Sequence, residues 1–172
     1  FYIRSRGNSG TNIFLTIMNT AIKTLNISKS YPGVQANSNV SVQIQDSTIH
    51  AIVGENGAGK STLMKILYGM TKPDEGEIEI FDQNASMSSP KDAINFGIGM
   101  VHQHFMLAKN LTVLENVILG IDRPSFKNLG LKKYKKLIEE VMSLYSLDID
   151  LDMFVEELSV GEKQRVEIIK VL

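Results

Sequence analysis

A glycine-rich stretch constrains this chain more than any other feature of its sequence. It reads Gly54-Glu55-Asn56-Gly57-Ala58-Gly59-Lys60-Ser61-Thr62. This is the pattern G-x-x-x-x-G-K-[ST], in which the glycines let successive backbone N–H groups turn toward the oxygens of a phosphate. A short apolar run, residues 49–53, precedes it, and an amphipathic segment at helical spacing follows it. The sequence therefore predicts a strand, a phosphate-binding loop and a helix whose positive N-terminal end faces the phosphates.

Individual residues of this loop have separate expected roles. Lys60 supplies a mobile positive charge for the β- and γ-phosphates of a nucleotide, and the hydroxyl of Ser61 is a ligand for Mg²⁺. Lys60 is also the first of two candidate catalytic residues. We expect contacts with the nucleotide from Gly54, Asn56, Gly57, Ala58, Gly59, Lys60, Ser61 and Thr62.

The other segments follow the pattern of an α/β protein. Expected strands cover residues 21–28 (edge or half-buried), 40–44, 49–53 (central), 77–81 and 98–101. Expected helices follow the glycine loop, where Gly69 can end the first of them, start at Pro90, and cover residues 131–147. Two capping boxes, Thr112 with Glu115 and Ser159 with Glu162, predict two more helices. Residues from about 112 to 160 are mainly helical and are expected to form a subdomain.

Composition and charge exclude several classes of protein. Hydrophobic residues make up 43% of the 172 residues and charged residues 22%, as in ordinary globular proteins. The net charge is -1, which gives no electrostatic sign of a nucleic-acid partner. The chain has no cysteine, which excludes disulfides and thiolate metal sites.

The N-terminal residues contain one apolar run, residues 13–18, after Arg4 and Arg6. It is shorter than the roughly 18 residues of a membrane span and than the about 7–15 apolar residues of a signal peptide, and no small-residue cleavage site follows it. We therefore expect Met18 to be the natural start and residues 1–20 to be a non-native or disordered extension. Any membrane association is expected to come through a partner.

A second motif lies near the end of the chain. It reads Leu158-Ser159-Val160-Gly161-Glu162-Lys163-Gln164-Arg165-Val166. A well-capped helix is the simpler interpretation of these residues alone. The segment nevertheless resembles the signature motif of ABC ATPases, most often written LSGGQ, with its Gln-Arg-Val continuation. The resemblance implies that Ser159, Gly161 and Glu162 bind the γ-phosphate held by an opposite cassette, a role that a free helix N-terminus can fill.

Two further residues acquire roles from this resemblance. Gln103 matches the family's Q-loop glutamine, which reaches Mg²⁺ and the attacking water, and it is the second candidate catalytic residue. Tyr31 matches the aromatic residue that stacks on adenine. On their own, a polar loop residue and a tyrosine packed in a turn are the simpler interpretations. His102 and His104 flank Gln103, but no third metal ligand is evident, so only Mg²⁺ is expected as a metal.

The resemblance extends over residues 21–172, and two features narrow it to one subfamily of ABC ATPases. Val160 and Glu162 depart from the commonest signature, and the same variant is similar to that of sugar- and nucleoside-importer ATPases. Residues 97–120 resemble the first of two tandem cassettes in bacterial nucleoside and simple-sugar importer ATPases. This implies a P-loop NTPase fold of the ABC nucleotide-binding type with a helical subdomain. It also implies import of a nucleoside, or of a pentose or other simple sugar, powered by ATP with Mg²⁺.

Partners and location follow from the same resemblance. It implies membrane permease subunits, which face the segment from Gln103 to about Gly120 and the helices that follow it. A second cassette is implied, in tandem or as a dimer, and an extracellular substrate-binding protein indirectly. The expected location is the cytoplasmic face of the cell membrane, as a peripheral subunit.

Part of the family's catalytic machinery is not found in these 172 residues. In the family, the Walker B strand with its Mg-binding Asp and catalytic Glu, and the switch His, follow the signature helix. The domain is therefore expected to be truncated before the Walker B strand, and inactive in this form. Two alternatives stay open: a soluble ABC-type ATPase of translation or DNA repair, which residues 97–120 disfavour, and a non-catalytic nucleotide-binding or regulatory module.

Overall fold

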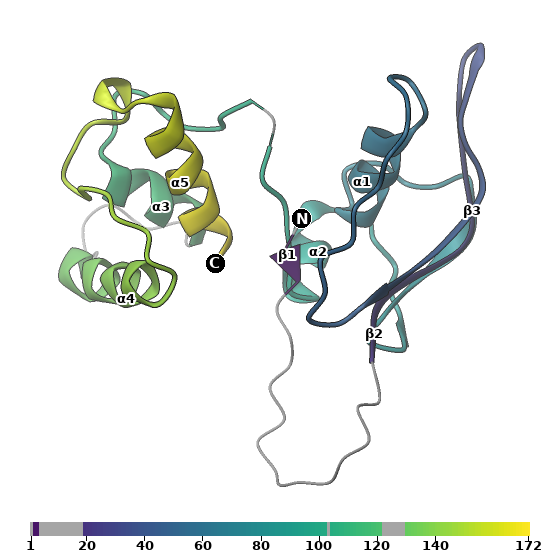
Figure 1. The fold of residues 1–172 in the computed structure, drawn as a ribbon, viewed down its shortest axis with the longest axis horizontal. Helices are drawn as coiled ribbons and strands as arrows, with labels where there is room; N and C mark the ends of the chain where they lie inside the picture. Colours follow the sequence, from purple (N-terminus) through teal and green to yellow (C-terminus); the bar gives the residue numbers. More distant parts are fainter. Residues whose placement is uncertain (1, 4–18, 103, 122–129) are drawn as a thin grey trace, which may run out of the picture. The chain divides into compact units, whose positions relative to one another are not determined.

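The computed structural model describes residues 2–3, 19–102, 104–121 and 130–172, and it divides into two compact units, Phe1–Gly99 and Met100–Leu172 (Figure 1). The elements of the first unit are β1 (Tyr2–Ile3), β2 (Thr20–Tyr31), β3 (Val34–Gln45), α1 (Lys60–Leu67), β4 (Glu75–Ile80), β5 (Gln83–Asn84), α2 (Pro90–Asn95) and β6 (Ile98–Gly99). Those of the second unit are α3 (Val113–Ile121), α4 (Leu131–Leu144), the 3-10 helix η1 (Val155–Glu157) and α5 (Val160–Val171). Most of the predicted N-terminal extension lies outside the described residues. In the described part of the chain, no helix is both long and apolar enough to cross a bilayer.

An antiparallel sheet with the strand order β3-β2-β4-β5 forms the body of the first unit. β2 pairs with β3 on one side and with β4 on the other, so the predicted strand at residues 21–28 is present but is not an edge strand. Ile22 and Ile27 of β2 are buried, while its last residue, Tyr31, is exposed. A turn at Pro32 and Gly33 joins β2 to β3, with Gly33 at a φ of 78°. The long hairpin therefore presents Tyr31 at its tip, opposite Val34.

α1 packs its apolar stripe against this sheet. The shared core consists of Leu63, Ile66 and Leu67 of α1 with Ile22, Ile27, Ile78 and Ile80 of the strands, among others. Gly69 ends the helix, as predicted, with a φ of 72°. Its N–H donates to the Ile66 carbonyl at 3.0 Å, and the Met70 N–H donates to the Lys65 carbonyl at 2.8 Å. These two bonds form a Schellman motif, which satisfies the last carbonyls of α1.

The predicted central strand at residues 49–53 is wrong. These residues form neither helix nor strand, and the side chains of Ile49 and Val53 are 102% and 92% exposed. β-Branched residues favour extended backbone, but a strand also needs a neighbour that shares its backbone hydrogen bonds. Among the described residues, no strand pairs with this run.

Two other predicted elements of the first unit, β4 and β6, are present with different ends, and a third, α2, begins where it was predicted. β4 stops at Ile80 because Phe81 and Asp82 both have a positive φ, 48° and 59°, and form the two-residue turn to β5. α2 begins at Pro90, as predicted. β6 is shorter than the predicted strand at residues 98–101, and it pairs antiparallel with β1.

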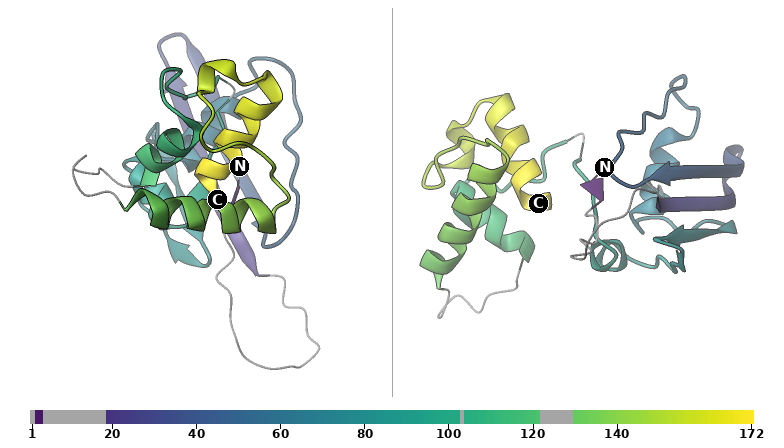
Figure 2. Two further views of the ribbon diagram at one scale, coloured as in Figure 1. Left: turned by 90° about the vertical axis from the view of Figure 1, so that its left-hand side faces the viewer. Right: turned by 60° about the horizontal axis from the view of Figure 1, so that its bottom comes forward.

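The second unit consists of helices around a core of its own (Figure 2). Both predicted capping boxes are present; in the first, the Thr112 N–H donates to the Glu115 carboxylate at 2.8 Å and the Glu115 N–H donates to Thr112 Oγ1 at 3.2 Å. α4 ends at Leu144 rather than at residue 147. The reason is Ser146, whose φ of 53° is incompatible with a continuing helix.

Asp74 ties the end of β2 to the turn before β4, and it gives this region an expected acid sensitivity. Its carboxylate accepts from Lys29 Nζ at 2.6 Å and from the Ser30 N–H at 2.7 Å. These bonds, the Lys29 bond foremost, lower the pKa of Asp74 from its ordinary value of 3.8. A carboxyl with a depressed pKa stabilises the fold above its unfolded-state pKa and loses that contribution as the pH falls through its folded-state pKa.

We therefore expect the melting temperature of Asp74→Asn to depend less on pH than that of the wild type between about pH 5 and about pH 2. Thermal unfolding followed by circular dichroism at stepped pH values measures this. Asp82→Asn, at the exposed turn after β4, is the matched control. Parallel pH profiles for Asp74→Asn and the wild type would contradict the prediction.

Candidate nucleotide-binding site

The glycine loop ends at the first turn of α1. Gly59 is the N-cap of α1 with a φ of 82°, and Gly57 has a φ of 87°. The bond from the Leu63 N–H to the Gly59 carbonyl, at 2.9 Å, is the first within the helix, so the N–H groups of residues 59–62 have no acceptor there. A glycine N-cap has no side chain that could accept them. These donors therefore gather at the positive end of α1, where an anion is favoured.

Lys60 bends back over the loop. Its Nζ donates to the carbonyl oxygens of Gly54 at 2.5 Å and of Glu55 at 2.6 Å. Residues 53–58 are exposed, so an incoming anion can reach the ammonium group. Backbone N–H groups, one ammonium and the hydroxyl of Ser61 form a donor set that fits a nucleotide triphosphate, with Ser61 as the group that could hold Mg²⁺. The predicted residues Gly54, Asn56, Gly57, Ala58, Gly59, Lys60, Ser61 and Thr62 all lie in this loop and in the first turn of α1.

β3 supports the loop through the position of Gly59. A Cβ at this position would lie 1.9 Å from the carbonyl oxygen of Ala36 and 2.8 Å from Asn37 Nδ2. Asn37 is buried, and its Nδ2 donates to the Gly59 carbonyl at 3.3 Å. The loop is therefore anchored by a backbone approach that only glycine permits and by one buried amide.

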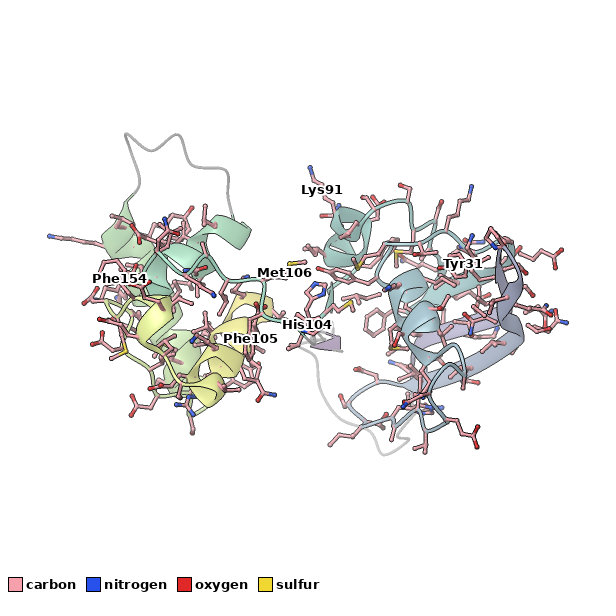
Figure 3. The ribbon with its side chains drawn as sticks, turned by 90° about the horizontal axis from the view of Figure 1, so that it is seen from above. Tyr31, Lys91, His104, Phe105, Met106 and Phe154 are labelled. Atoms are coloured by element: carbon pink, nitrogen blue, oxygen red, sulfur yellow. The ribbon has the colours of Figure 1, made fainter. Side chains whose placement is uncertain are left out.

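Tyr31 lies at the tip of the β2–β3 hairpin and is 43% exposed (Figure 3). It pairs with Val34, and Ala36 follows two residues along β3, at about 3.3 Å per residue. The hairpin thus carries Tyr31 close to the position where β3 supports Gly59. Lys29 Nζ lies 5.7 Å from the centre of the Tyr31 ring. An exposed ring near a phosphate loop is suited to stacking on a base.

The predicted signature residues lie at the start of α5, in the second unit. The Ser159 hydroxyl donates to Glu162 Oε2 at 2.6 Å, and the Ser159 N–H donates to the same carboxylate at 2.8 Å. These bonds, the hydroxyl bond foremost, lower the pKa of Glu162, so the carboxylate is ionised at neutral pH. A Cβ on Gly161 would meet no atom within 4 Å. The N–H and the hydroxyl of Ser159 are therefore already bound to Glu162, through the capping box that the sequence predicts.

Comparison with known proteins finds a matching family and named relatives. A model of the ABC transporter family matches residues 37–172. The chain belongs to the ABC transporter family. It is 43% identical over 155 residues to the guanosine import ATP-binding protein NupO of Bacillus subtilis, with 90% of this chain and 30% of that protein covered. It is 46% identical over 153 residues to the nucleoside import ATP-binding protein NupA of Lactococcus lactis, with 89% and 30% covered.

A solved ABC transporter cassette has the same fold. The dimeric structure of a bacterial cassette matches with a TM-score of 0.71 and 31% identity, over 88% of this chain and 68% of that chain. Further relatives are named as glucose and ribose import ATP-binding proteins. The chain spans about 30% of the length of the curated relatives it matches. These matches confirm the predicted P-loop NTPase fold and the resemblance to importer ATPases.

Gln103 lies outside the described residues, so its catalytic and Mg²⁺-binding roles stay predictions. Within the described ranges, no group of three or more His, Asp or Glu side chains is placed to hold a metal ion. Tyr31 and the glycine loop belong to the first unit, whereas Ser159, Gly161 and Glu162 belong to the second.

Sequence reasoning missed the buried polar side chains that hold this ABC domain together. Asn37, Asn116 and Glu167 are all buried and all hydrogen-bond to backbone groups. A single polar residue in an alternating strand or an amphipathic helix is usually on the solvent side, so the pattern does not mark it. For Glu167 alone, the sequence offered a sign of burial: it lies between Val166 and Ile169, two apolar residues of the same helix that are both buried.

Stacking by Tyr31 has a testable consequence. A base–aromatic stack is worth about 1–3 kcal/mol, so we expect Tyr31→Ala to weaken ATP binding by roughly five- to hundredfold. Tyr31→Phe keeps the ring and should bind ATP nearly as the wild type does. Titration calorimetry on both variants measures the difference. Equal ATP affinities in the two variants would remove Tyr31 from the site.

Proposed function

We propose that this chain is the ATP-binding part of an importer ATPase whose intact form hydrolyses ATP, with Mg²⁺, to power the uptake of a nucleoside across the cell membrane. A pentose or another simple sugar is the alternative cargo. The observation that carries the proposal is the set of donors at the start of α1, where Lys60 bends over a glycine loop. The preference for a nucleoside rests on the relatives named for guanosine and nucleoside import.

Each residue of the loop has a defined task in this proposal. The N–H groups of residues 59–62 hold phosphate oxygens, and Lys60 exchanges its bonds to Gly54 and Glu55 for the β- and γ-phosphates. Ser61 offers its hydroxyl to Mg²⁺, and Tyr31 covers the adenine. Bound Mg²⁺ neutralises charge on the phosphates. Gln103 is proposed to orient the attacking water, so that nucleotide binding and water positioning come from different parts of the chain.

Two kinds of partner complete the proposal. A membrane permease would dock on the second unit, where Phe105 and Met106 expose apolar side chains before α3. A second cassette would bring its own nucleotide to the start of α5, where Ser159, Gly161 and Glu162 would meet the γ-phosphate. An extracellular substrate-binding protein would act indirectly, through the permease. The working location would be the cytoplasmic face of the membrane, as a peripheral subunit.

We expect the intact natural protein to hydrolyse ATP and the 172-residue chain not to do so. Phosphoryl transfer needs a group that positions the attacking water as well as phosphate and metal binding. Within this sequence, Glu55 lies in the phosphate loop and Glu162 in the capping box of α5, so neither is in the position of the family's catalytic glutamate. We expect a phosphate-release assay to detect turnover by the intact protein and none by the 172-residue chain.

Lys60→Ala versions of both proteins control for contaminating ATPases. Turnover by the short chain that depends on Lys60 would show that a catalytic group lies within these residues. Tight ATP binding without turnover by the intact protein would instead support a non-catalytic nucleotide-binding module. With the permease in vesicles, stimulation of turnover by guanosine or by ribose would assign the cargo.

A further inference from the structure

Residues 105–108 form neither helix nor strand, yet side chains of two helices hold their backbone in place. The Met106 N–H donates to Glu167 Oε1 at 2.6 Å, and the Met106 carbonyl accepts from Lys170 Nζ at 3.0 Å. Two residues on, the Ala108 N–H donates to Asn116 Oδ1 at 2.8 Å, and Asn116 Nδ2 donates back to the Ala108 carbonyl at 3.0 Å. Side chains of α3 and α5 thus supply the backbone partners that a neighbouring strand would give.

Glu167 is the unusual member of this arrangement. Glu167 is only 2% exposed, and its carboxylate lies 3.8 Å from Lys170 Nζ. An ionised carboxylate is tolerated in a core only when it is paired and hydrogen-bonded. Here its partners are the backbone N–H of Met106 and the ammonium of Lys170, and that ammonium holds the carbonyl of the same Met106. We call the two side chains the Met106 clamp.

The Met106 clamp connects two features of the second unit. On one side, Phe105 and Met106 are exposed apolar residues, marked in Figure 3. On the other, α5 runs back from Glu167 to its N-cap, Ser159. A helix is a stiff rod with a rise of about 1.5 Å per residue, so its third turn and its first turn move together.

We propose that Glu167 and Lys170 are positioning residues that lock the Met106 backbone to α5, so that the exposed Phe105–Met106 pair and the Ser159 end of the helix move as one body. The part of this proposal that concerns coupling rests on the proposed function. In an importer ATPase, the Ser159 end would respond to nucleotide and the Phe105–Met106 pair would contact the permease. The clamp would then transmit the nucleotide-bound or nucleotide-free state of the Ser159 end to the Phe105–Met106 pair.

The first test measures the clamp itself, without ATP turnover. In the intact natural protein, hydrogen–deuterium exchange at the Met106 amide should be at least about tenfold faster in Glu167→Ala than in the wild type, because the bond to a charged acceptor is lost. Glu167→Gln keeps an acceptor oxygen and should restore much of the protection. Glu140→Ala, an exposed glutamate on α4, is the matched control. If Glu167→Ala does not fold, Lys170→Met gives the second measurement: it removes the bond to the Met106 carbonyl and the ion pair with Glu167 but leaves the Met106 N–H its acceptor.

The second test asks whether the clamp couples the two ends. With the permease in vesicles, clamp variants should keep the ATP turnover measured without cargo and lose most of its stimulation by cargo. Unchanged exchange at Met106 in Glu167→Ala and Lys170→Met would overturn the clamp. Faster exchange with full stimulation would overturn the coupling role. Absence of ATP turnover in the wild type would reject the proposed function but not the clamp. The hydrogen–deuterium exchange at Met106 would still show whether the clamp exists.

Discussion

Replacing Lys60 by alanine is expected to lower the affinity for ATP by about 10- to 100-fold, because hydrogen bonds to a charged group contribute roughly 1.5–3 kcal/mol. The ammonium of Lys60 is the side-chain cation at the start of α1, and its present partners are two neutral carbonyls of its own loop. A phosphate oxygen is a better acceptor for it than either carbonyl. Titration calorimetry with Mg-ATP on the intact natural protein measures the loss.

Lys65→Ala is the matched control for this experiment. Lys65 lies in the last turn of the same helix and is exposed, so its removal changes the net charge of α1 equally without touching the loop. We expect ATP affinity close to that of the wild type in this control. Equal losses in the two variants would mean that the whole charge of the helix matters and that Lys60 has no special contact.

Gly59→Ala should have the second large effect, on folding as well as on binding. The new Cβ would lie 1.9 Å from the Ala36 carbonyl oxygen, which is backbone and cannot turn away. The left-handed conformation costs a residue with a side chain about 1–2 kcal/mol, and overpacking adds about 1–3 kcal/mol. We expect the free energy of unfolding of the first unit to fall by the sum of the two, and ATP binding to be lost.

Gly57→Ala separates these two costs. Gly57 has a similar φ of 87°, but a Cβ there would meet nothing within 4 Å. This variant should lose only the conformational part, about 1–2 kcal/mol. Urea unfolding of both variants measures the difference. If Gly57→Ala is as damaging as Gly59→Ala, the contact with β3 does not set the shape of the loop.

The position of the phosphate loop could be predicted from sequence because its determinants are local. The glycines, Lys60 and the apolar stripe of α1 lie within a few residues of one another. Both capping boxes were predicted for the same reason, since Ser159 and Glu162 form their bonds within one turn. Interactions between residues that are close in the sequence can therefore be predicted from the sequence alone.

Features that depend on distant partners could not be predicted in this way. Residues 49–53 have the composition of a strand, but a strand also requires a neighbour, and composition does not supply one. The contact of Gly59 with β3 and the bond of Glu167 to Met106 join residues far apart in the chain. The capping-box pattern predicts the bonds between Ser159 and Glu162, but it does not by itself indicate that the Glu162 carboxylate would compete with a ligand for Ser159.

That capping box makes any ligand binding through Ser159 an exchange reaction. The N–H and the hydroxyl of Ser159 are already bound to an ionised carboxylate, at 2.8 Å and 2.6 Å. A phosphate that takes these donors must first displace Glu162, whose charge has the same sign. The apparent affinity is then the intrinsic affinity multiplied by the fraction of molecules in which the box is open. In the proposed pair of cassettes, a nucleotide that binds through Ser159 would therefore have to hold these two donors more strongly than Glu162 does.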